Sequence, residues 1–273
     1  MVTRIALSGL IAAAIFAAAG TASAYHDEEH RPTYQTGYTL NQGEWQIGLL
    51  STDVGVHDRL TLGIDHLYYA LPIFNAHARI NLFRDGDWGL TISGSIYYFN
   101  VDLFWWASPE ATRGWLVAWP LELRGSIPLT ERFTLHPFAA LSMSSGKVEQ
   151  TDDAYGGAAA ANNFQIGLTT EWRITRVFAL NLRFRFAPWV DVSGAGGGTI
   201  QFDPATSVEV AASGELDTSE AEFAFSFVLA AHFSWSWFNL RIGGGWGNMN
   251  LPGLNFLFVQ RSPIVELGVF ARF

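Results

Sequence analysis

Apolar and polar side chains alternate along many short stretches of this chain. Between residues 177 and 190, one parity is largely apolar and the other carries asparagine and arginine. Successive side chains of a β-strand point to opposite faces, so this stretch is predicted to be a strand with one apolar face and one cationic face. Similar alternation returns at 115–124, 164–173 and 238–246. The pattern predicts an all-β fold.

Strand-like stretches alternate with turns and loops from residue 33 onward. The predicted strands are 33–40, 44–50, 59–65, 76–83, 88–100, 114–126, 132–144, 163–173, 177–190, 222–233, 238–247 and a last stretch that ends at Phe273. The tight turns are 53–58, 84–87, 128–131, 174–176 and a turn near 235, and the longer stretches between them are 102–113, 146–162, 191–221 and 248–261. A small hairpin is expected at 199–210. Stretch 33–40 is the least regular, so the count is about 12 strands, or about 10 if a weak pair does not form.

The composition separates two all-β architectures. A soluble sandwich buries its apolar faces between two sheets, whereas a membrane barrel presents them to lipid. Of the 273 residues, 49% are hydrophobic and 15% are charged. After residue 24, no apolar run approaches the roughly 20 residues that a membrane-spanning helix needs. High apolar content without a long apolar run favours a transmembrane antiparallel up-and-down β-barrel.

The tryptophans gather at the ends of the predicted strands. Trp88, Trp172, Trp235 and Trp237 lie beside tight turns, and Trp105, Trp106, Trp115, Trp189 and Trp246 lie beside the longer stretches. An amphipathic indole ring is favoured at the level of lipid head groups, so two rings of tryptophan predict the two membrane interfaces. A buried core gives no reason for this placement.

The N-terminus has the features of a secretory signal peptide. A cation precedes a short apolar run, which ends at the small residues Ala22-Ser23-Ala24. We expect cleavage after residue 24; a membrane anchor helix is the alternative, but the apolar run is short for one. Residues 25–32 are predicted to be a solvated periplasmic tail, although they contain two histidines, and 33–273 to be the barrel domain. The chain has no cysteine, and its residues predict neither a cofactor nor a metal.

The last ten residues alternate back from a terminal aromatic residue, with Val265, Leu267, Val269, Ala271 and Phe273 on one parity. This ending resembles the closing strand of Gram-negative outer-membrane β-barrels. The resemblance implies an outer-membrane location, with lipid and the barrel-assembly machinery as partners and Phe273 as part of the assembly signal. Barrels of this class have short periplasmic turns and long external loops, which assigns the tight turns to the periplasm.

Projection of the strands places a set of charged residues on the inward parity. They are Asp65, Arg79, Glu122, Arg124, Glu171, Arg173, Arg183, Arg185, Arg241 and Glu266, together with Arg272, His77, His136 and His232. Seven arginines against four carboxylates predict a positive lumen. It is either a salt-bridged filling or a pore that weakly prefers anions. Arg183 and Arg185 have no carboxylate on their own strand, so selectivity should depend mainly on them.

Three function classes fit a barrel of this kind. The first is a small diffusion channel or transporter-like, porin-like pore whose substrate the sequence does not indicate. The second is a plugged barrel that is structural or binds a ligand or partner through its loops. The third is a lipid-modifying enzyme, which would need a serine and a histidine on the lipid-facing surface. His66 has no serine at a suggestive spacing and no nucleophile elbow is present, so the chain is predicted not to be an enzyme. The net charge of -9 argues against nucleic acid as a partner.

Overall fold

A computed structural model describes most of the chain after residue 32. The described residues are 33–70, 73–100, 112–150, 156–196, 198–203, 206–210, 224–235, 237–251 and 256–273. The predicted signal peptide and the predicted tail at 25–32 lie outside them, as do Trp105 and Trp106. No helix in these ranges is both long and apolar enough to cross a membrane.

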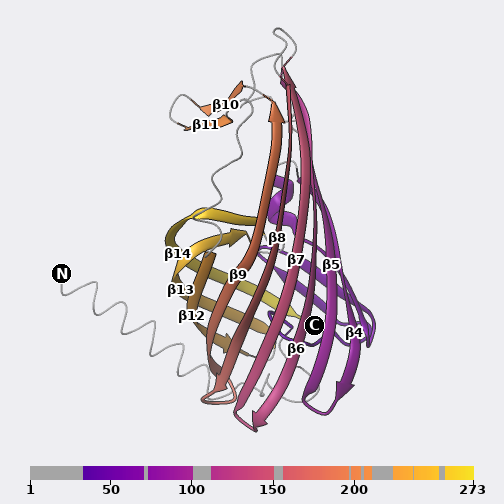
Figure 1. The fold of residues 1–273 in the computed structure, drawn as a ribbon. Coiled ribbons are helices and arrows are strands. Elements are labelled where there is room, and N and C mark those ends of the chain that lie inside the picture. The colour runs from indigo at the N-terminus through magenta and orange to yellow at the C-terminus, as the bar shows by residue number, and fades with distance from the viewer. Residues whose placement is uncertain are drawn as a thin grey trace, which may run out of the picture.

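Twelve strands form one closed antiparallel barrel, in the order β1-β14-β13-β12-β9-β8-β7-β6-β5-β4-β3-β2 (Figure 1). They are β1 (Trp45–Gly48), β2 (Thr52–His57), β3 (Leu60–Ile64), β4 (Ile73–Asp85), β5 (Trp88–Asn100), β6 (Thr112–Thr130), β7 (Phe133–Gln150), β8 (Gly156–Arg173), β9 (Phe178–Gly196), β12 (Ala224–Ser234), β13 (Phe238–Leu251) and β14 (Phe256–Arg272). A 3-10 helix, η1 (His66–Ala70), follows β3, and β10 (Gly198–Asp203) pairs with β11 (Thr206–Val210). The predicted all-β barrel, its strand count and the small hairpin are confirmed.

One member of the predicted set of strands is wrong. Residues 33–40 form no strand, and the twelfth strand is β2, which covers most of the predicted turn 53–58. The tight connections at 86–87, 131–132 and 174–177 lie at the same end of the barrel as the turn 58–59 between β2 and β3. We call this the turn end, and the opposite end the loop end.

The strands differ greatly in length around the barrel. β6 to β9 have 18 or 19 residues each, whereas β1, β2 and β3 have 4, 6 and 5. In Figure 1 the long strands rise well above the rest of the wall at the loop end. Much of the predicted loop 146–162 is therefore strand, because Gly146 pairs with Ala159 and Glu149 with Gly156.

The outer surface is apolar and ringed by indoles at both ends. Trp88, Trp172 and Trp237 at the turn end are 48%, 53% and 58% exposed, and Trp115, Trp189 and Trp246 toward the loop end are 40%, 46% and 45% exposed. Polar side chains are instead buried inside the wall, as Gln165 and Asn239 are. A polar interior and an apolar exterior with two aromatic girdles are the pattern of barrels in the bacterial outer membrane.

Candidate functional site

The segment Thr33–Leu40 lies inside the barrel at the turn end, where it forms a plug. Tyr38 and Leu40 are 1% and 0% exposed although neither belongs to a strand. The Tyr38 hydroxyl donates to the carbonyl of Asp87, 2.6 Å away in the turn between β4 and β5. The Thr39 hydroxyl donates to the carbonyl of Asp58 at 2.9 Å, in the turn between β2 and β3. The interior is therefore occupied close to the turns.

Three arginines of the wall bind the plug. Arg79 of β4 donates to the carbonyl oxygens of Thr33 and Tyr38. Arg124 of β6 donates to the carbonyl of Gln35 at 3.0 Å, and Arg241 of β13 reaches the side-chain oxygen of Gln35 at 3.4 Å. β4 and β6 are separated only by β5, whereas β13 lies on the other side of the barrel, so guanidinium groups reach the segment from two sides.

Neutral side chains complete the attachment of the plug. Ser126 of β6 accepts a hydrogen bond from the backbone N–H of Gly37 at 2.7 Å, and Thr61 of β3 accepts one from Leu40 at 2.9 Å. The ring of His136 on β7 lies edge-on to Tyr38, with 6.5 Å between ring centroids. Because strands from β3 to β13 contribute, the plug adopts one arrangement rather than resting loosely in a wide pore.

Several of the residues predicted to face the lumen are paired with each other. Arg124 Nε lies 2.8 Å from Glu122 Oε1, and Arg173 Nε lies 2.8 Å from Glu171 Oε1. Each pair comes from a single strand. The two pairs balance the charge of two of the seven arginines that were predicted to face the lumen.

Glu266 joins two further predicted residues. Arg241 Nη2 lies 3.0 Å from Glu266 Oε2, and Arg183 Nη2 contacts Glu266 Oε1. β9 and β14 are separated by β12 and β13 in the barrel wall, so the contact between Arg183 and Glu266 crosses the interior. Arg183 therefore acquires a carboxylate partner from the closing strand.

Arg185 occupies a different environment from Arg183. Its Nη1 donates to Gln165 Oε1 at 2.6 Å, and its guanidinium lies 4.9 Å from the centroid of the Phe138 ring. The guanidinium of Arg124 lies 4.4 Å from the same ring. The inward set predicted from the sequence contains only polar residues, and it therefore omits Phe138, which shares the parity of His136.

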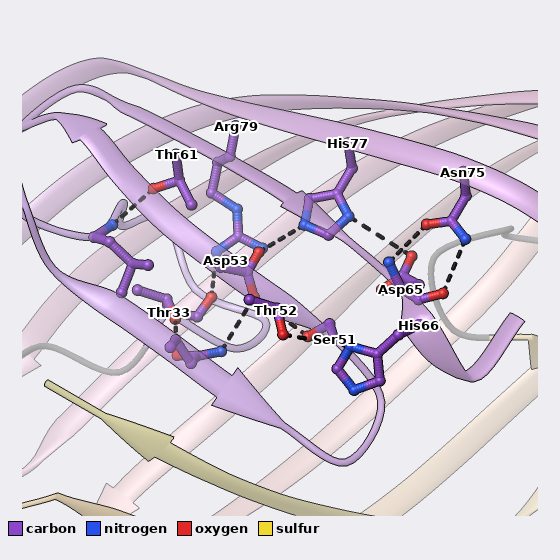
Figure 2. Close-up of polar contacts among 12 residues, drawn as sticks. Thr33, Ser51, Thr52, Asp53, Thr61, Asp65, His66, Asn75, His77 and Arg79 are labelled. Atoms are coloured by element: carbon purple, nitrogen blue, oxygen red, sulfur yellow. Dashed lines mark hydrogen bonds and ion pairs between the residues drawn. The ribbon is translucent and has the colours of Figure 1, made fainter. Parts of the chain in front are cut away.

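Asp65 belongs to a second polar cluster, near the short strands (Figure 2). His77 of β4 places Nε2 at 2.6 Å from Asp53 Oδ1 and Nδ1 at 3.7 Å from Asp65 Oδ2. The Tyr97 hydroxyl also donates to Asp65. The side chains of Asp53, His77 and Asp65 keep 15%, 19% and 18% exposure, so none of the three is fully buried. Asp53 was missed in the sequence because it had been assigned to a turn.

A hydroxyl and an imidazole meet at the loop-end tip of the hairpin formed by β1 and β2. Thr52 Oγ1 lies 3.4 Å from His66 Nδ1, and His66 Nε2 lies 2.7 Å from the carbonyl oxygen of Gly48. The sequence prediction considers only a serine as the partner of His66, and it therefore omits Thr52, which is 14 residues away. Among the described residues, no group of three or more histidines and carboxylates is arranged to hold a metal ion.

Comparison with known proteins adds little beyond the fold. No protein-family model and no curated protein matches the chain. The outer membrane protease OmpT from Escherichia coli is 12% identical over 84% of this chain and 89% of its own, with a TM-score of 0.36. OmpT, an outer membrane protein of Vibrio cholerae, is 8% identical over 92% and 70%, with a TM-score of 0.34. CdiB from Acinetobacter baumannii is 11% identical over 84% and 59%, with a TM-score of 0.26.

The prediction that the chain is not an enzyme is wrong as an exclusion of all enzymes. One of the similar solved structures is an outer membrane protease, so a fold of this kind does not by itself rule out catalysis. Similarity at this level also assigns no activity to this chain. The absence of a serine near His66 also no longer argues against an enzyme, because Thr52 supplies a hydroxyl beside the imidazole.

Proposed function

We propose that this protein is a gated outer-membrane channel that its own segment Thr33–Leu40 holds closed. The observation that carries the proposal is the plug itself, which fills the turn end of the barrel and is bound by Arg79, Arg124 and Arg241. The plugged structural barrel stands as the opposing interpretation.

The chemistry of the plug supports a gate over a permanent filling. It is attached mainly by hydrogen bonds between its backbone and wall side chains, not by a strand ladder. A typical hydrogen bond contributes a net of about 1 kcal/mol, because water replaces it when it breaks. Such contacts can be exchanged for water in the lumen. A wall strand, by contrast, would leave its backbone groups unpaired in lipid.

Planar bilayer recordings on the refolded chain test the gate. Tyr38→Ala with Leu40→Ala removes the two fully buried anchors of the plug. The matched control is Tyr98→Ala with Leu82→Ala, which truncates two lipid-facing side chains that are 40% and 51% exposed. We expect the conductance of the plug variant to be severalfold greater than that of the wild type. The conductance of the control should equal that of the wild type.

A cross-link provides the opposite test. Thr33 Oγ1 lies 2.9 Å from Gln46 Oε1, and the chain has no cysteine of its own. In a Thr33→Cys, Gln46→Cys variant, a short cleavable thiol cross-linker should abolish openings, and cleavage should restore them. If the Tyr38→Ala, Leu40→Ala variant is folded and inserted but conducts no more than the wild type, the protein is a structural barrel and not a gated channel.

The Thr52–His66 pair favours a second candidate function, hydrolysis of acyl esters at the membrane surface. An imidazole held through one nitrogen by a carbonyl and facing a hydroxyl with the other is an arrangement that activates a nucleophile. Hydrogen bonds of this kind are often long before substrate binds. Thr52→Val should lower esterase activity by about a hundredfold or more. Absence of esterase activity in the wild type would exclude this candidate function and would not affect the gated-channel proposal.

A further inference from the structure

Ser126, His136 and Glu171 form a buried row across three adjacent strands at the turn end. Ser126 belongs to β6, His136 to β7 and Glu171 to β8, and their exposures are 1%, 1% and 2%. Ser126 Oγ lies 2.8 Å from His136 Nδ1, and His136 Nε2 lies 3.9 Å from Glu171 Oε2. A hydroxyl, an imidazole and a carboxylate in this order are the components of a serine hydrolase triad.

The carboxylate of Glu171 sets the tautomer of His136. The ring proton of a neutral imidazole is favoured on the nitrogen that faces a carboxylate, which here is Nε2. Nδ1 is then the acceptor for the hydroxyl proton of Ser126. In the described part of the chain, Nε2 has no hydrogen-bond partner, because 3.9 Å is longer than a hydrogen bond. Catalytic hydrogen bonds are often long before a substrate binds, so this distance agrees with a resting site.

The plug covers Ser126 with a glycine. A Cβ on Gly37 would lie 2.9 Å from the backbone N of Ser126 and 2.8 Å from the carbonyl oxygen of Gly89, so a larger residue would not fit there. The N–H of Gly37 donates to Ser126 Oγ at 2.7 Å. A peptide group of the plug therefore lies directly against the hydroxyl that faces His136.

The wall around Ser126 binds the plug through its peptide carbonyls. Arg124 stands two residues from Ser126 on the same face of β6 and donates to the carbonyl of Gln35 at 3.0 Å. Arg79 donates to two further peptide carbonyls of the plug. A guanidinium beside the nucleophile stabilises the negative oxygen that forms when a carbonyl is attacked. These donors fit the backbone of an extended peptide.

The orientation of the plug protects it from attack by Ser126. A hydrogen bond from an N–H lies near the plane of its peptide group, whereas a nucleophile approaches the carbonyl carbon from outside that plane. Ser126 Oγ is held at the N–H edge of the peptide group between Thr36 and Gly37. The plug therefore occupies the hydroxyl without presenting a carbonyl carbon to it.

We propose that Ser126 is the nucleophile of a latent peptidase, which the plug inhibits until it leaves the site. Ser126 Oγ attacks the carbonyl carbon of a peptide that takes the place of the plug, and its proton passes to His136 Nδ1. His136 gives that proton to the leaving amine as the carbon–nitrogen bond breaks, and water then hydrolyses the acyl ester on Ser126. Glu171 is a positioning residue that keeps the ring proton on Nε2. The activity rests on the proposed release of the plug, and it does not involve Thr52 or His66.

A fluorophosphonate probe on the full chain in lipid vesicles tests the nucleophile. The probe forms a bond between its phosphorus and a reactive serine Oγ and releases fluoride, and peptide mass spectrometry locates the added mass. In Gly37→Ala the new methyl group must move the plug off Ser126, so Ser126 should be labelled many times faster than in the wild type. Ser144 of β7 is the internal control, because it is buried like Ser126 but donates to the carbonyl of Ala161 at 2.7 Å. It should stay unlabelled.

Three further measurements assign the partners of Ser126. In the Gly37→Ala background, His136→Asn should slow labelling by about a hundredfold, as expected for the loss of a general base. The nitrogen chemical shifts of the imidazole report its tautomer, and Glu171→Gln should move the ring proton of His136 from Nε2 toward Nδ1. A synthetic peptide with the sequence of residues 33–40 should slow the labelling of Gly37→Ala, because it returns to the site of the plug. An unchanged rate with this peptide would exclude peptides as the substrate class.

A folded Gly37→Ala protein without label on Ser126 would overturn the proposal, because the plug would no longer cover the hydroxyl. Equal labelling of Ser126 and Ser144 would also overturn it, since His136 would then give no activation. Planar bilayer recordings on the same preparation test the gate separately. Greater conductance without label on Ser126 would support the gated channel and exclude the peptidase, whereas label on Ser126 without greater conductance would support the peptidase and count against the channel.

Discussion

Glu266 compensates two buried cations at once. Arg183 and Arg241 both bind its carboxylate, and the side-chain exposures of the three groups are 10%, 5% and 13%. A buried ion pair adds little net stability when compared with apolar residues, but removal of one partner leaves the other charge uncompensated. The single carboxylate therefore matters more than either arginine.

Glu266→Gln is expected to lower the free energy of unfolding by about 3 kcal/mol, because it leaves two guanidinium groups without a counter-charge. Urea unfolding of the protein in lipid vesicles measures the change. Glu131→Gln is the matched control, since Glu131 is exposed in the turn between β6 and β7. If the free energy of unfolding falls no more than in the control, water already solvates the guanidinium groups of Arg183 and Arg241.

Anion preference remains a prediction, and the structure narrows the residues on which it depends. Glu266 offsets Arg183, while Arg185 contacts a neutral amide and an aromatic ring. In the channel opened by Tyr38→Ala and Leu40→Ala, the reversal potential across a salt gradient should favour anions weakly. Adding Arg185→Ser should shift it toward cations more than adding Arg183→Ser does. The opposite order of the two shifts would contradict this assignment.

At the scale of elements, β2 shows where pattern reading fails. Asp53, Gly55 and Asp58 are residues that favour turns, which made 53–58 look like a turn. Asp58 does stand in the turn between β2 and β3, but Asp53 and Gly55 have tertiary roles instead. Asp53 binds His77, and Gly55 allows the chain to pass closely, since a Cβ there would collide with the carbonyl of Asn41. Glycine within a strand often marks such a close approach.

Gly55→Ala should therefore loosen the plug, although Gly55 itself lies outside it. The added methyl group would meet the carbonyl of Asn41 and lie 3.1 Å from the Leu40 Cβ, which displaces the end of the plug. We expect more frequent channel openings in planar bilayers. Gly244→Ala is the control, because the nearest atom to its added Cβ lies 3.8 Å away. Equal opening frequencies in the two variants would show that Gly55 does not affect the gate.

The plug marks the limit of what the sequence could predict. Eleven of the twelve strands, the apolar exterior and the polar interior follow from alternation, because each depends on neighbours along the chain. The position of 33–40 depends on partners far away in sequence, such as Arg241, which is 206 residues from Gln35. A partial signal was present, since Thr36 interrupts what would be the apolar face of this stretch as a strand. The same long separation hid the contact of Arg183 with Glu266.

At the scale of the whole molecule, the two ends of β7 provide a test of orientation. Glu131 stands in the turn before this strand, and Lys147 lies near its far end, paired with Ala158. Residues rise roughly 3.3 Å each along a strand, so with a tilt of about 40° the two positions are roughly 40 Å apart across the membrane. The apolar band of an outer-membrane barrel is about 25 Å tall, so the two side chains lie on opposite sides of it.

Single cysteines at these positions report which side faces the outside, because the chain has no other thiol. Short turns face the periplasm in barrels of this class. A membrane-impermeant maleimide added to intact cells should label Lys147→Cys and should label Glu131→Cys only after the outer membrane is permeabilised. Both residues are exposed, so neither label requires unfolding. Labelling of Glu131→Cys alone in intact cells would invert the topology and place the plug at the outer mouth of the barrel.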